Sequence, residues 1–304
     1  MGRAFLGEAE LTEREGAVLL AMAGTIFSFS AVAYRAVGVA NDWQFLAYRG
    51  GSTALVMFGL VALRRRSRPV DFGATTWKVV FAGFLLAITS MLYILALSRI
   101  SAATTLLLLA AAPVYAAVFG WLLLRERVQS ATFVAIGVTM VGVAIMVGTG
   151  LEAGSGLGLL FAMLIPILVG LYNVVLRSAP SADPVVPALL AGVFLAVGAA
   201  AAALASGGLG VSWRDAALAC LSGGVALGIG LPLFNIGHRS VPAARVSLLL
   251  MTEIVLAPLW VWIWPGETPR IGTLIGGAIV LGAVVWLVAG SSDSEDQVIV
   301  ESGR

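Results

Sequence analysis

The chain is a succession of long apolar runs separated by short polar stretches. Each run approaches the twenty or so mostly apolar residues that a helix needs to cross a bilayer. The ten runs span residues 16–38, 43–63, 74–97, 101–123, 130–149, 157–177, 185–206, 215–237, 242–264 and 271–290. The pattern predicts an all-α membrane protein with ten transmembrane helices.

Polar segments flank the apolar part of the chain. Residues 1–15 carry four glutamates and lack the basic start of a cleavable signal peptide. Residues 291–304, SSDSEDQVIVESGR, have the composition of a disordered tail. Between these two segments, residues 16–149 and 157–290 form two halves with five predicted spans each.

Composition supports the same class of protein. Hydrophobic residues make up 60% of the chain, charged residues 11%, and the mean hydropathy is +1.01. Soluble domains carry about 25% charged residues. The pI near 9.0 does not indicate nucleic-acid binding, because the basic residues are scattered between the apolar runs. The expected surroundings are therefore a lipid bilayer, and Cys220, the one cysteine, cannot form an internal disulfide.

The positions of Lys and Arg predict how the chain is oriented. With the N-terminus inside, 13 of the 18 basic residues fall on the inner side and five on the outer side. The outer five are Arg35, Arg49, Arg99, Arg214 and Arg270. The cluster from Arg64 to Arg68 dominates the count, and positive residues favour the cytoplasmic side. We therefore expect both termini in the cytoplasm.

The two halves of the chain are similar in sequence. A shift of 141 residues aligns the segment Ala96–Gly148 with the second half without gaps, and 12 of 53 positions are identical. Trp121 then meets Trp262, and Glu126 meets Glu267. Each half has five predicted spans, an odd number, so the second half must enter the membrane from the side opposite to the first. The pattern predicts an inverted repeat, which is typical of secondary transporters that bind solute between their halves; chance similarity is the alternative.

A loop glutamate followed by spaced glycines occurs in both halves. In the first half these residues are Glu126, Gly137 and Gly142, and in the second they are Glu267, Gly272, Gly276, Gly277 and Gly282. Over about residues 16–290 the chain resembles the EamA-type repeats of the drug/metabolite transporter superfamily, and it is most similar there to bacterial aromatic amino acid exporters. The resemblance implies ten helices in a bacterial inner membrane. It also implies a cavity lined by helices one to four and six to nine, with helices five and ten outside. The second copy has WPGETPR where the first has LLRERVQ, which argues against exact two-fold symmetry.

Glu253 is the acidic residue expected in the middle of a span. It lies in Leu248–Trp264, whereas the other 15 of the 16 acidic residues fall in tails, loops or helix ends. A carboxylate in hydrocarbon costs several kcal/mol, roughly, unless a cation, water or protonation compensates. Glu253 is therefore expected on a solute pathway, as a proton-coupling group or as a neutralising partner. A hydrogen bond to a neighbouring helix for packing is the alternative.

Arg49 lies about six residues into the second span, or roughly 9 Å below its outer end. Three roles are open. Its guanidinium can bind the carboxylate of an amino acid through parallel hydrogen bonds. It can instead pair with Glu253, or extend to the outer headgroups.

Other residues inside the spans are candidates for the pathway. The aromatic candidates are Tyr48, Tyr93, Tyr172 and Trp260, which suit a planar apolar solute. The polar candidates are Asn173, Asn235, Ser28, Ser30, Thr89 and Ser90. For each of them the alternative is packing between helices or a hydrogen bond to a carbonyl of its own helix.

Four prolines fall inside predicted helices. They are Pro113, Pro166, Pro232 and Pro258. Each removes a backbone hydrogen bond and permits a kink. Pro113 and Pro258 occupy the equivalent fourth and ninth spans, so these prolines are candidate gating hinges; static bends are the alternative.

The sequence offers little for enzyme chemistry. One histidine excludes HExxH and multi-histidine metal sites, and there is no Walker loop, GxSxG elbow or dinucleotide motif in a soluble domain. No catalytic residue, cofactor or metal is therefore expected. The predicted function is a secondary transporter that exports small metabolites by alternating access, with aromatic amino acids indicated by the resemblance and protons as a possible coupling ion.

Two other functions stay open. The same fold could carry a cationic drug or another metabolite, in which case Glu253 would bind the cation. The chain could also be a membrane scaffold or sensor that transports nothing, although such a protein has no need of two-sided symmetry. The small residues of the fifth and tenth spans favour close helix contact, either within one chain or between protomers, so the oligomeric state is open.

Overall fold

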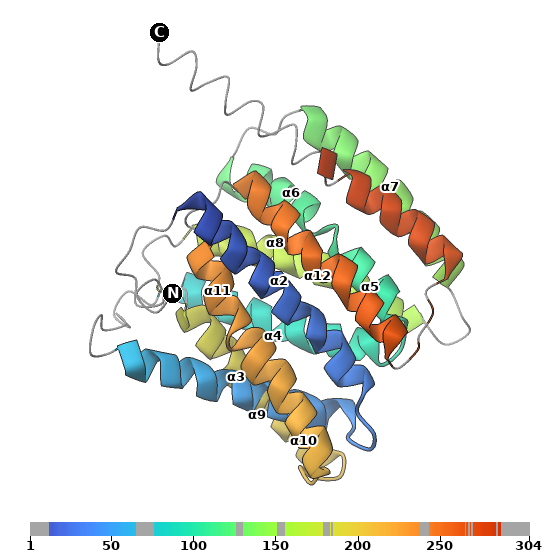
Figure 1. The fold of residues 1–304 in the computed structure, drawn as a ribbon. Coiled ribbons are helices and arrows are strands. Elements are labelled where there is room, and N and C mark those ends of the chain that lie inside the picture. The colour runs from blue at the N-terminus through green and yellow to red at the C-terminus, as the bar shows by residue number, and fades with distance from the viewer. Residues whose placement is uncertain are drawn as a thin grey trace.

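The structure is a computed structural model. It describes residues 12–64, 76–125, 130–150, 156–178, 183, 185–237, 243–264, 266, 268, 270–283 and 285–286. Within these residues every regular element is a helix, which confirms the predicted all-α class (Figure 1). The tail 291–304, the loop residues Glu126 and Glu267 and most of the Arg64–Arg68 cluster lie outside the described residues.

The helices fall on the predicted apolar runs. They are α2 (Glu13–Arg35), α3 (Asp42–Arg64), α4 (Trp77–Leu97), α5 (Ala102–Leu109), α6 (Ala112–Leu124), α7 (Ser130–Gly150), α8 (Gly156–Arg177), α9 (Val185–Ala205), α10 (Trp213–Cys220), the π-helix η2 (Leu221–Leu227), α11 (Gly230–Gly237) and α12 (Ala243–Ile263). A further apolar helix spans Ile271–Ala283.

Seven helical segments of the described chain are long and apolar enough to cross a membrane. They are α2, α3, α4, the pair α5–α6, α8, α9 and the series α10–η2–α11. Phe133–Ile145 within α7, and the helix Ile271–Ala283, are shorter apolar stretches. The chain is therefore a multi-pass membrane protein, and ten spans remain a prediction.

Local chemistry sets several helix starts. Thr12 and Glu15 form a capping box in which each side chain bonds the backbone N–H of the other. Ser101 caps α5 and Ser212 caps α10, each by accepting a hydrogen bond from the backbone N–H three residues later. These caps satisfy N–H groups that have no partner inside the helix.

Two predicted spans are interrupted. The fourth span breaks between α5 and α6, and Pro113 lies in the first turn of α6, where its missing N–H costs no hydrogen bond. The eighth span passes through η2 before α11, which contains Pro232. By contrast, α8 continues through Pro166 and α12 continues through Pro258. The equivalent fourth and ninth spans therefore differ, and the hinge role of the prolines remains a prediction.

Contacts between the two halves come in matched pairs. The helix α12 packs on α2, as α5 and α6 pack on α8. Likewise, the contact of α4 with α8 corresponds to the contact of α11 and η2 with α2. The contact of α4 with α9 corresponds to the contact of η2 and α10 with α3. The pair α3 and α9, which have equivalent places in the two halves, pack against each other. Exchanging the halves therefore reproduces the contact pattern, as expected of a repeat.

The halves cross where α3 meets α9. A Cβ added at Gly50 would lie 2.5 Å from the backbone N of Ala196, and one added at Gly192 would lie 2.7 Å from that of Ala54. In α3, Gly50 lies four residues before Ala54, and in α9, Gly192 lies four residues before Ala196. Small residues at this spacing let helix backbones approach closely in membranes. Arg49 is adjacent to Gly50 and so lies at this crossing.

The fifth and tenth predicted spans lie together at one side of the bundle. Figure 1 shows α7 beside the helix Ile271–Ala283. A Cβ at Gly142 would lie 2.7 Å from the carbonyl oxygen of Gly276. The hydroxyls of Thr104 and Thr273 are 3.2 Å apart and join the tenth span to α5. The small residues of these spans therefore make close contacts within one chain.

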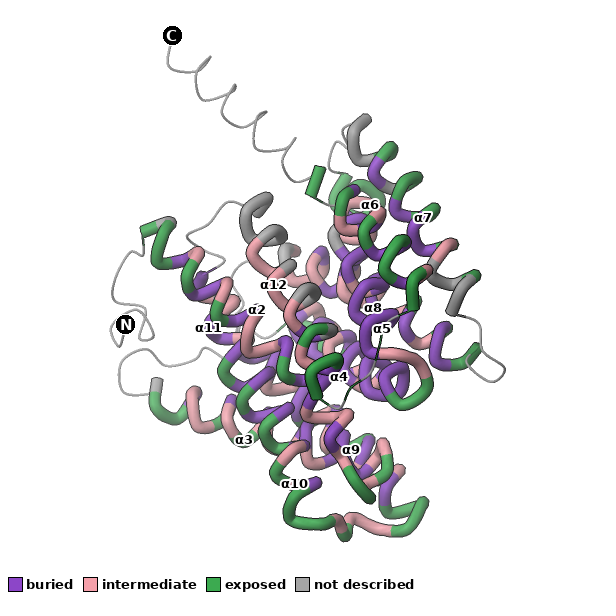
Figure 2. The backbone as a smooth tube through the Cα atoms, turned by 45° about the vertical axis from the view of Figure 1, so that its right-hand side comes forward, coloured by how far each residue is buried: buried purple, intermediate pink, exposed green. Residues whose placement is uncertain are grey.

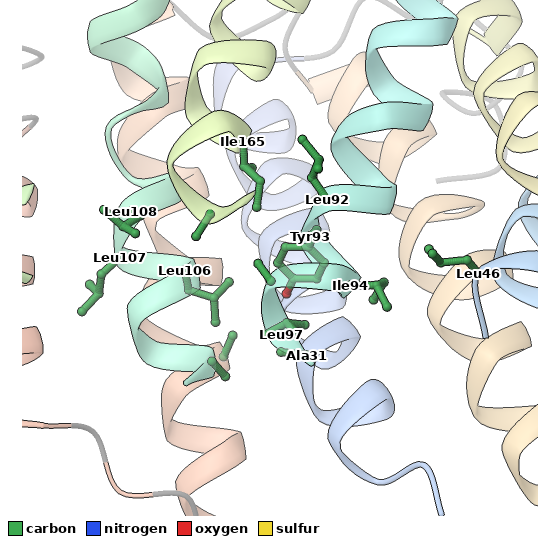
Figure 3. Packing of buried hydrophobic residues seen from close by; sticks show 14 of the residues in the cluster. Ala31, Leu46, Leu92, Tyr93, Ile94, Leu97, Leu106, Leu107, Leu108 and Ile165 are labelled. Atoms are coloured by element: carbon green, nitrogen blue, oxygen red, sulfur yellow. The ribbon is translucent and has the colours of Figure 1, made fainter. Parts of the chain in front are cut away.

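Buried residues concentrate on the inner faces of the helices (Figure 2). The central apolar cluster includes the fully buried Ile94, Leu97, Leu106 and Ile165 (Figure 3). Several tryptophans lie on the outer surface of the bundle; Trp213 is 84% exposed. An apolar outer surface is expected of a chain surrounded by lipid.

Candidate functional site

Arg49 is buried inside the bundle, with 3% of its surface exposed. Its Nε donates to Ser90 Oγ at 3.1 Å, and its Nη1 donates to Ser30 Oγ at 2.6 Å. Nη1 also donates to the carbonyl oxygen of Ser222 at 3.3 Å and makes a short contact with Ser222 Oγ. The three serines come from α4, α2 and η2, so the guanidinium points into the protein and not toward the headgroups.

The π-helix η2 explains how Ser222 reaches Arg49. A π-helical turn is wider than an α-helical one, and such turns occur frequently at functional sites. The next residue, Gly223, lies against α3 so closely that an added Cβ would overlap the carbonyl of Arg49. The wide turn and the missing side chain together bring the second half of the chain onto Arg49.

Tyr93 supplies a second polar group on the same side of α4 as Ser90, three residues later. Its side chain is 8% exposed, and its hydroxyl is buried without a hydrogen-bond partner in the described part of the chain. Figure 3 shows its ring beside Leu97 and Ala31. Buried hydroxyls are normally paired, so this one requires an explanation.

Glu253 approaches from α12. Its backbone N lies 3.4 Å from the position of a Cβ added at Gly24, so the glycine lets α12 pack closely on α2. The same helix α2 also contacts Arg49, through the hydroxyl of Ser30. No ion pair within 4 Å joins Glu253 to Arg49, and its carboxylate has no hydrogen bond to a described residue. The helix α2 thus links Glu253 to the surroundings of Arg49, and the two charged groups do not bond directly to each other.

An aromatic pair lies where α12 contacts α2, and its Phe29 is 49% exposed. Trp260 is seven residues beyond Glu253, so both lie on roughly the same face of α12. Its ring stacks on Phe29 with centroids 5.4 Å apart and planes 14° apart. Its Nε1 donates to Ser28 Oγ at 3.0 Å. The structure therefore brings two predicted residues, Trp260 and Ser28, into direct contact.

Three predicted residues lie elsewhere. The hydroxyl of Thr89 donates to the carbonyl of Leu85 in its own helix, at 2.8 Å. The hydroxyl of Tyr48 donates to the carbonyl of Leu209 in the loop before α10, at 3.1 Å. Tyr172 belongs to another apolar cluster, between α4 and α8.

The predicted amide of Asn173 makes no hydrogen bond to these residues. Asn173 is half-buried on α8. The side chain of Asn235 lies outside the described part of the chain. Sequence reasoning missed Ser222, although a serine followed by two glycines inside an apolar run is a signal of an unusual helix turn.

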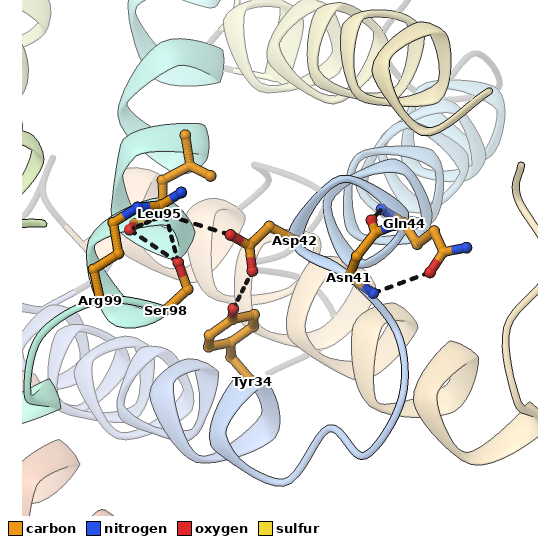
Figure 4. A network of polar contacts seen from close by, with 7 residues as sticks. All are labelled: Tyr34, Asn41, Asp42, Gln44, Leu95, Ser98 and Arg99. Carbon is orange, nitrogen blue, oxygen red and sulfur yellow. Dashed lines mark hydrogen bonds and ion pairs between the residues drawn. The ribbon is translucent and has the colours of Figure 1, made fainter. Parts of the chain in front are cut away.

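One end of the bundle carries a polar network that we call the clasp, formed by Tyr34, Asp42, Arg99, Gln44 and Asp215. Arg99 Nη1 lies 3.4 Å from a carboxylate oxygen of Asp42, whose other oxygen accepts a short hydrogen bond from the hydroxyl of Tyr34 (Figure 4). These contacts join the ends of α2, α3 and α4.

Asp215 and Gln44 extend the clasp across the two halves. The carboxylate of Asp215, with 2% of the residue exposed, accepts hydrogen bonds from the backbone N–H groups of residues 38, 39 and 40, each at 3.0 Å. The amide of Gln44 donates to the carbonyls of Gly208 and Gly210, at 2.9 and 3.1 Å. The loops 36–41 and 206–212 are therefore held together at this end.

Taken with the fold, these sites define a class of protein. Matched halves of apolar helices, with buried charged groups where they cross, are characteristic of membrane transporters built from repeats. The model of the EamA-like transporter family matches residues 14–148 and again residues 156–289. The chain belongs to this family, whose members are membrane transporters of small solutes and form part of the drug/metabolite transporter superfamily.

Comparison with solved structures supports the fold. Eighteen chains match, among them a crystal structure described only as a protein. It superposes with a TM-score of 0.64 at 18% sequence identity, over 91% of this chain and 98% of the other. No curated protein matches the sequence. The family resemblance is thus confirmed, whereas no finding singles out aromatic amino acids as the substrate.

Proposed function

We propose that this protein is a secondary transporter that exports small metabolites, with aromatic amino acids as its substrates, by alternating access. It would act in the bacterial inner membrane with both termini in the cytoplasm. The observation that carries the proposal is the burial of Arg49 at the crossing of the two halves without an ion pair to a described residue. A charged group inside a membrane bundle is costly, and such groups mark solute pathways.

Arg49 is the proposed ligand for the carboxylate of the solute. Two of its nitrogens are held by serines, while Nη2 has no hydrogen bond to a described residue and can donate to a solute. A charge-assisted hydrogen bond of this kind is stronger than a neutral one. The stacked Trp260 and Phe29 offer an aromatic surface for the solute's ring.

Alternating access follows from how the site is assembled. Ser30 and Ser90 come from the first half and Ser222 from the second, so movement of one half against the other changes the surroundings of Arg49. The clasp joins the halves at the end expected to face outward. Its opening would expose the site on that side.

A cationic solute is the second candidate. The observation that favours it is the carboxylate of Glu253, which has no hydrogen bond or ion pair to a described residue. A cation bound there would leave Arg49 without a role in solute binding.

Flux into liposomes tests the proposal. Purified protein is reconstituted, and uptake of radiolabelled tryptophan, phenylalanine and unrelated solutes is followed with and without a pH gradient. We expect flux of the aromatic amino acids and its loss in Arg49→Gln. The control Arg214→Gln removes an exposed arginine from α10 and should transport normally. Flux of organic cations alone would favour the second candidate, and no flux from folded protein would overturn both.

A further inference from the structure

The polar groups around Arg49 that lack partners define what a solute must offer. They are Nη2 of Arg49, the hydroxyl of Tyr93 and the carboxylate of Glu253, none of which bonds to a described residue. Two are donors and one is an acceptor with a negative charge. Leaving such groups unpaired away from water is unfavourable, and more so for charged groups.

These groups converge from three different helices. Arg49 lies on α3, Tyr93 on α4 and Glu253 on α12, and α2 connects them because it contacts both Arg49 and the backbone at Glu253. The contact points on α2, Ser30 and Gly24, are six residues apart, which is about 9 Å along a helix. The two opposite charges form no direct ion pair within 4 Å.

A zwitterion offers each of the two charged groups a partner of opposite charge. We infer that Arg49, Tyr93 and Glu253 bind the head group of an α-amino acid. Nη2 of Arg49 and the hydroxyl of Tyr93 donate to the solute's carboxylate, and the carboxylate of Glu253 accepts from its ammonium group. This inference rests on the proposed transport function and names the head group that the site requires.

Charge balance explains why both ends of the head group are needed. Arg49 and Glu253 together carry no net charge, and a zwitterion adds none. A solute with a carboxylate alone leaves Glu253 without a counter-charge, and a solute with an amine alone leaves Arg49 without one. An uncompensated charge is expensive in the bundle interior, so each partial solute should bind poorly.

The head group and the ring of the solute are recognised at separate places. Trp260 and Phe29 form the aromatic surface, and Trp260 follows Glu253 by seven residues, or about 10 Å along α12. The zwitterion requirement therefore applies to any transported amino acid, whatever side chain the aromatic surface selects.

Competition against radiolabelled tryptophan tests this requirement on wild-type protein in nanodiscs. The competitors are tryptophan, indole-3-propionate, which lacks the amine, and tryptamine, which lacks the carboxylate. We expect each analogue to compete at least about tenfold more weakly than tryptophan, because each loses a charge-assisted contact. An analogue that competes within tenfold of tryptophan overturns the inference and leaves the transport function standing.

Substitutions test which residue binds which charged group of the solute. Glu253→Gln should remove the advantage of tryptophan over indole-3-propionate, and Tyr93→Phe should weaken tryptophan about tenfold while leaving tryptamine unchanged. The matched control Tyr172→Phe removes a hydroxyl from a separate apolar cluster and should leave tryptophan binding unchanged. Equal tryptophan affinity in Tyr93→Phe and wild type overturns the role of Tyr93.

The experiment also separates the two proposals. If wild-type protein binds no aromatic amino acid but binds another amino acid and rejects that solute's amine-free and carboxylate-free analogues, the aromatic substrate fails and the zwitterion site stands. If no α-amino acid binds to folded protein, both fail.

Discussion

At the residue scale, Arg49 is better understood as a binding group than as a stabilising one. Three neutral serines hold its guanidinium, and no carboxylate among the described residues lies within ion-pair distance. Neutral hydrogen bonds recover only part of the cost of burying a charge. An apolar side chain at this position would stabilise the fold without the cost of burying a charge. A role in binding solute therefore explains the arginine better than a role in stability alone.

Replacement of Glu253 by glutamine tests proton coupling. The change keeps the size of the side chain and removes the group that can carry a proton. If Glu253 couples transport to protons, wild-type tryptophan flux in liposomes should respond to a pH gradient and the flux of Glu253→Gln should not. A variant that keeps the wild-type response to the gradient would show that coupling lies elsewhere.

The same variant separates coupling from binding. A pure coupling role leaves tryptophan affinity unchanged, whereas the zwitterion site predicts that affinity falls about tenfold or more with the loss of the ammonium's counter-charge. Measuring the dissociation constant without a gradient, beside the flux, distinguishes these roles. Thermal unfolding of both proteins is the control for folding.

The charged residues of the site could be predicted from sequence, as could Ser30 and Ser90, but Ser222 could not. Arg49 and Glu253 stand out because charges are rare and costly in an apolar run. A serine in a helix most often bonds a carbonyl of its own helix, as Ser52 does with the carbonyl of Arg49 in α3. Ser222 differs because a π-turn directs it at Arg49, and sequence periodicity does not reveal such a turn.

At the scale of elements, the crossing of α3 and α9 depends on the absence of side chains at two glycines. Gly50 lies in the crossing, while Gly51, its neighbour in α3, has no atom within 4 Å of an added Cβ. Alanine substitutions at Gly50 and Gly51 therefore separate the packing effect of an added methyl group from its effect on helix propensity.

Gly50→Ala should destabilise the protein by about 1–3 kcal/mol, because the new Cβ meets the backbone of α9. Gly51→Ala should be neutral or stabilising by up to about 1 kcal/mol, because alanine favours the helix and meets nothing. Unfolding by denaturant in detergent micelles measures both changes. Equal effects of the two substitutions would contradict the close crossing.

The repeat could be recognised from sequence, but the contact between α3 and α9 at its centre could not. Trp121 and Glu126 revealed it because tryptophan and glutamate are rare enough for a match to be informative. Gly50 and Gly192 carry the contact at the centre, but glycine is frequent in this chain and such a match carries little weight. The break of the fourth span near Pro113, without a matching break in α12, also departs from the symmetry of the repeat.

At the scale of the whole molecule, the clasp indicates which end is closed. It holds the connections 36–41 and 206–212 together through Asp215 and Gln44, and these connections belong to different halves. Alternating access requires the halves to separate at this end in part of the cycle. In the proposed cycle the hydrogen bonds of Asp215 would then break, so they would contribute to the balance between the closed and open states.

Asp215→Ala should therefore shift the protein toward the state that is open at this end. A cysteine placed at Thr53, which is buried one turn beyond Arg49, reports the opening when Cys220 is replaced by serine. An impermeant maleimide added outside should label this cysteine several-fold faster in the Asp215→Ala background, because three hydrogen bonds across the halves are lost. Asp183→Ala removes a carboxylate before α9, at the opposite end, and should not accelerate labelling. Faster labelling from the inside in the Asp215→Ala background would reverse the predicted orientation, and no change from either side would show that the clasp does not control access.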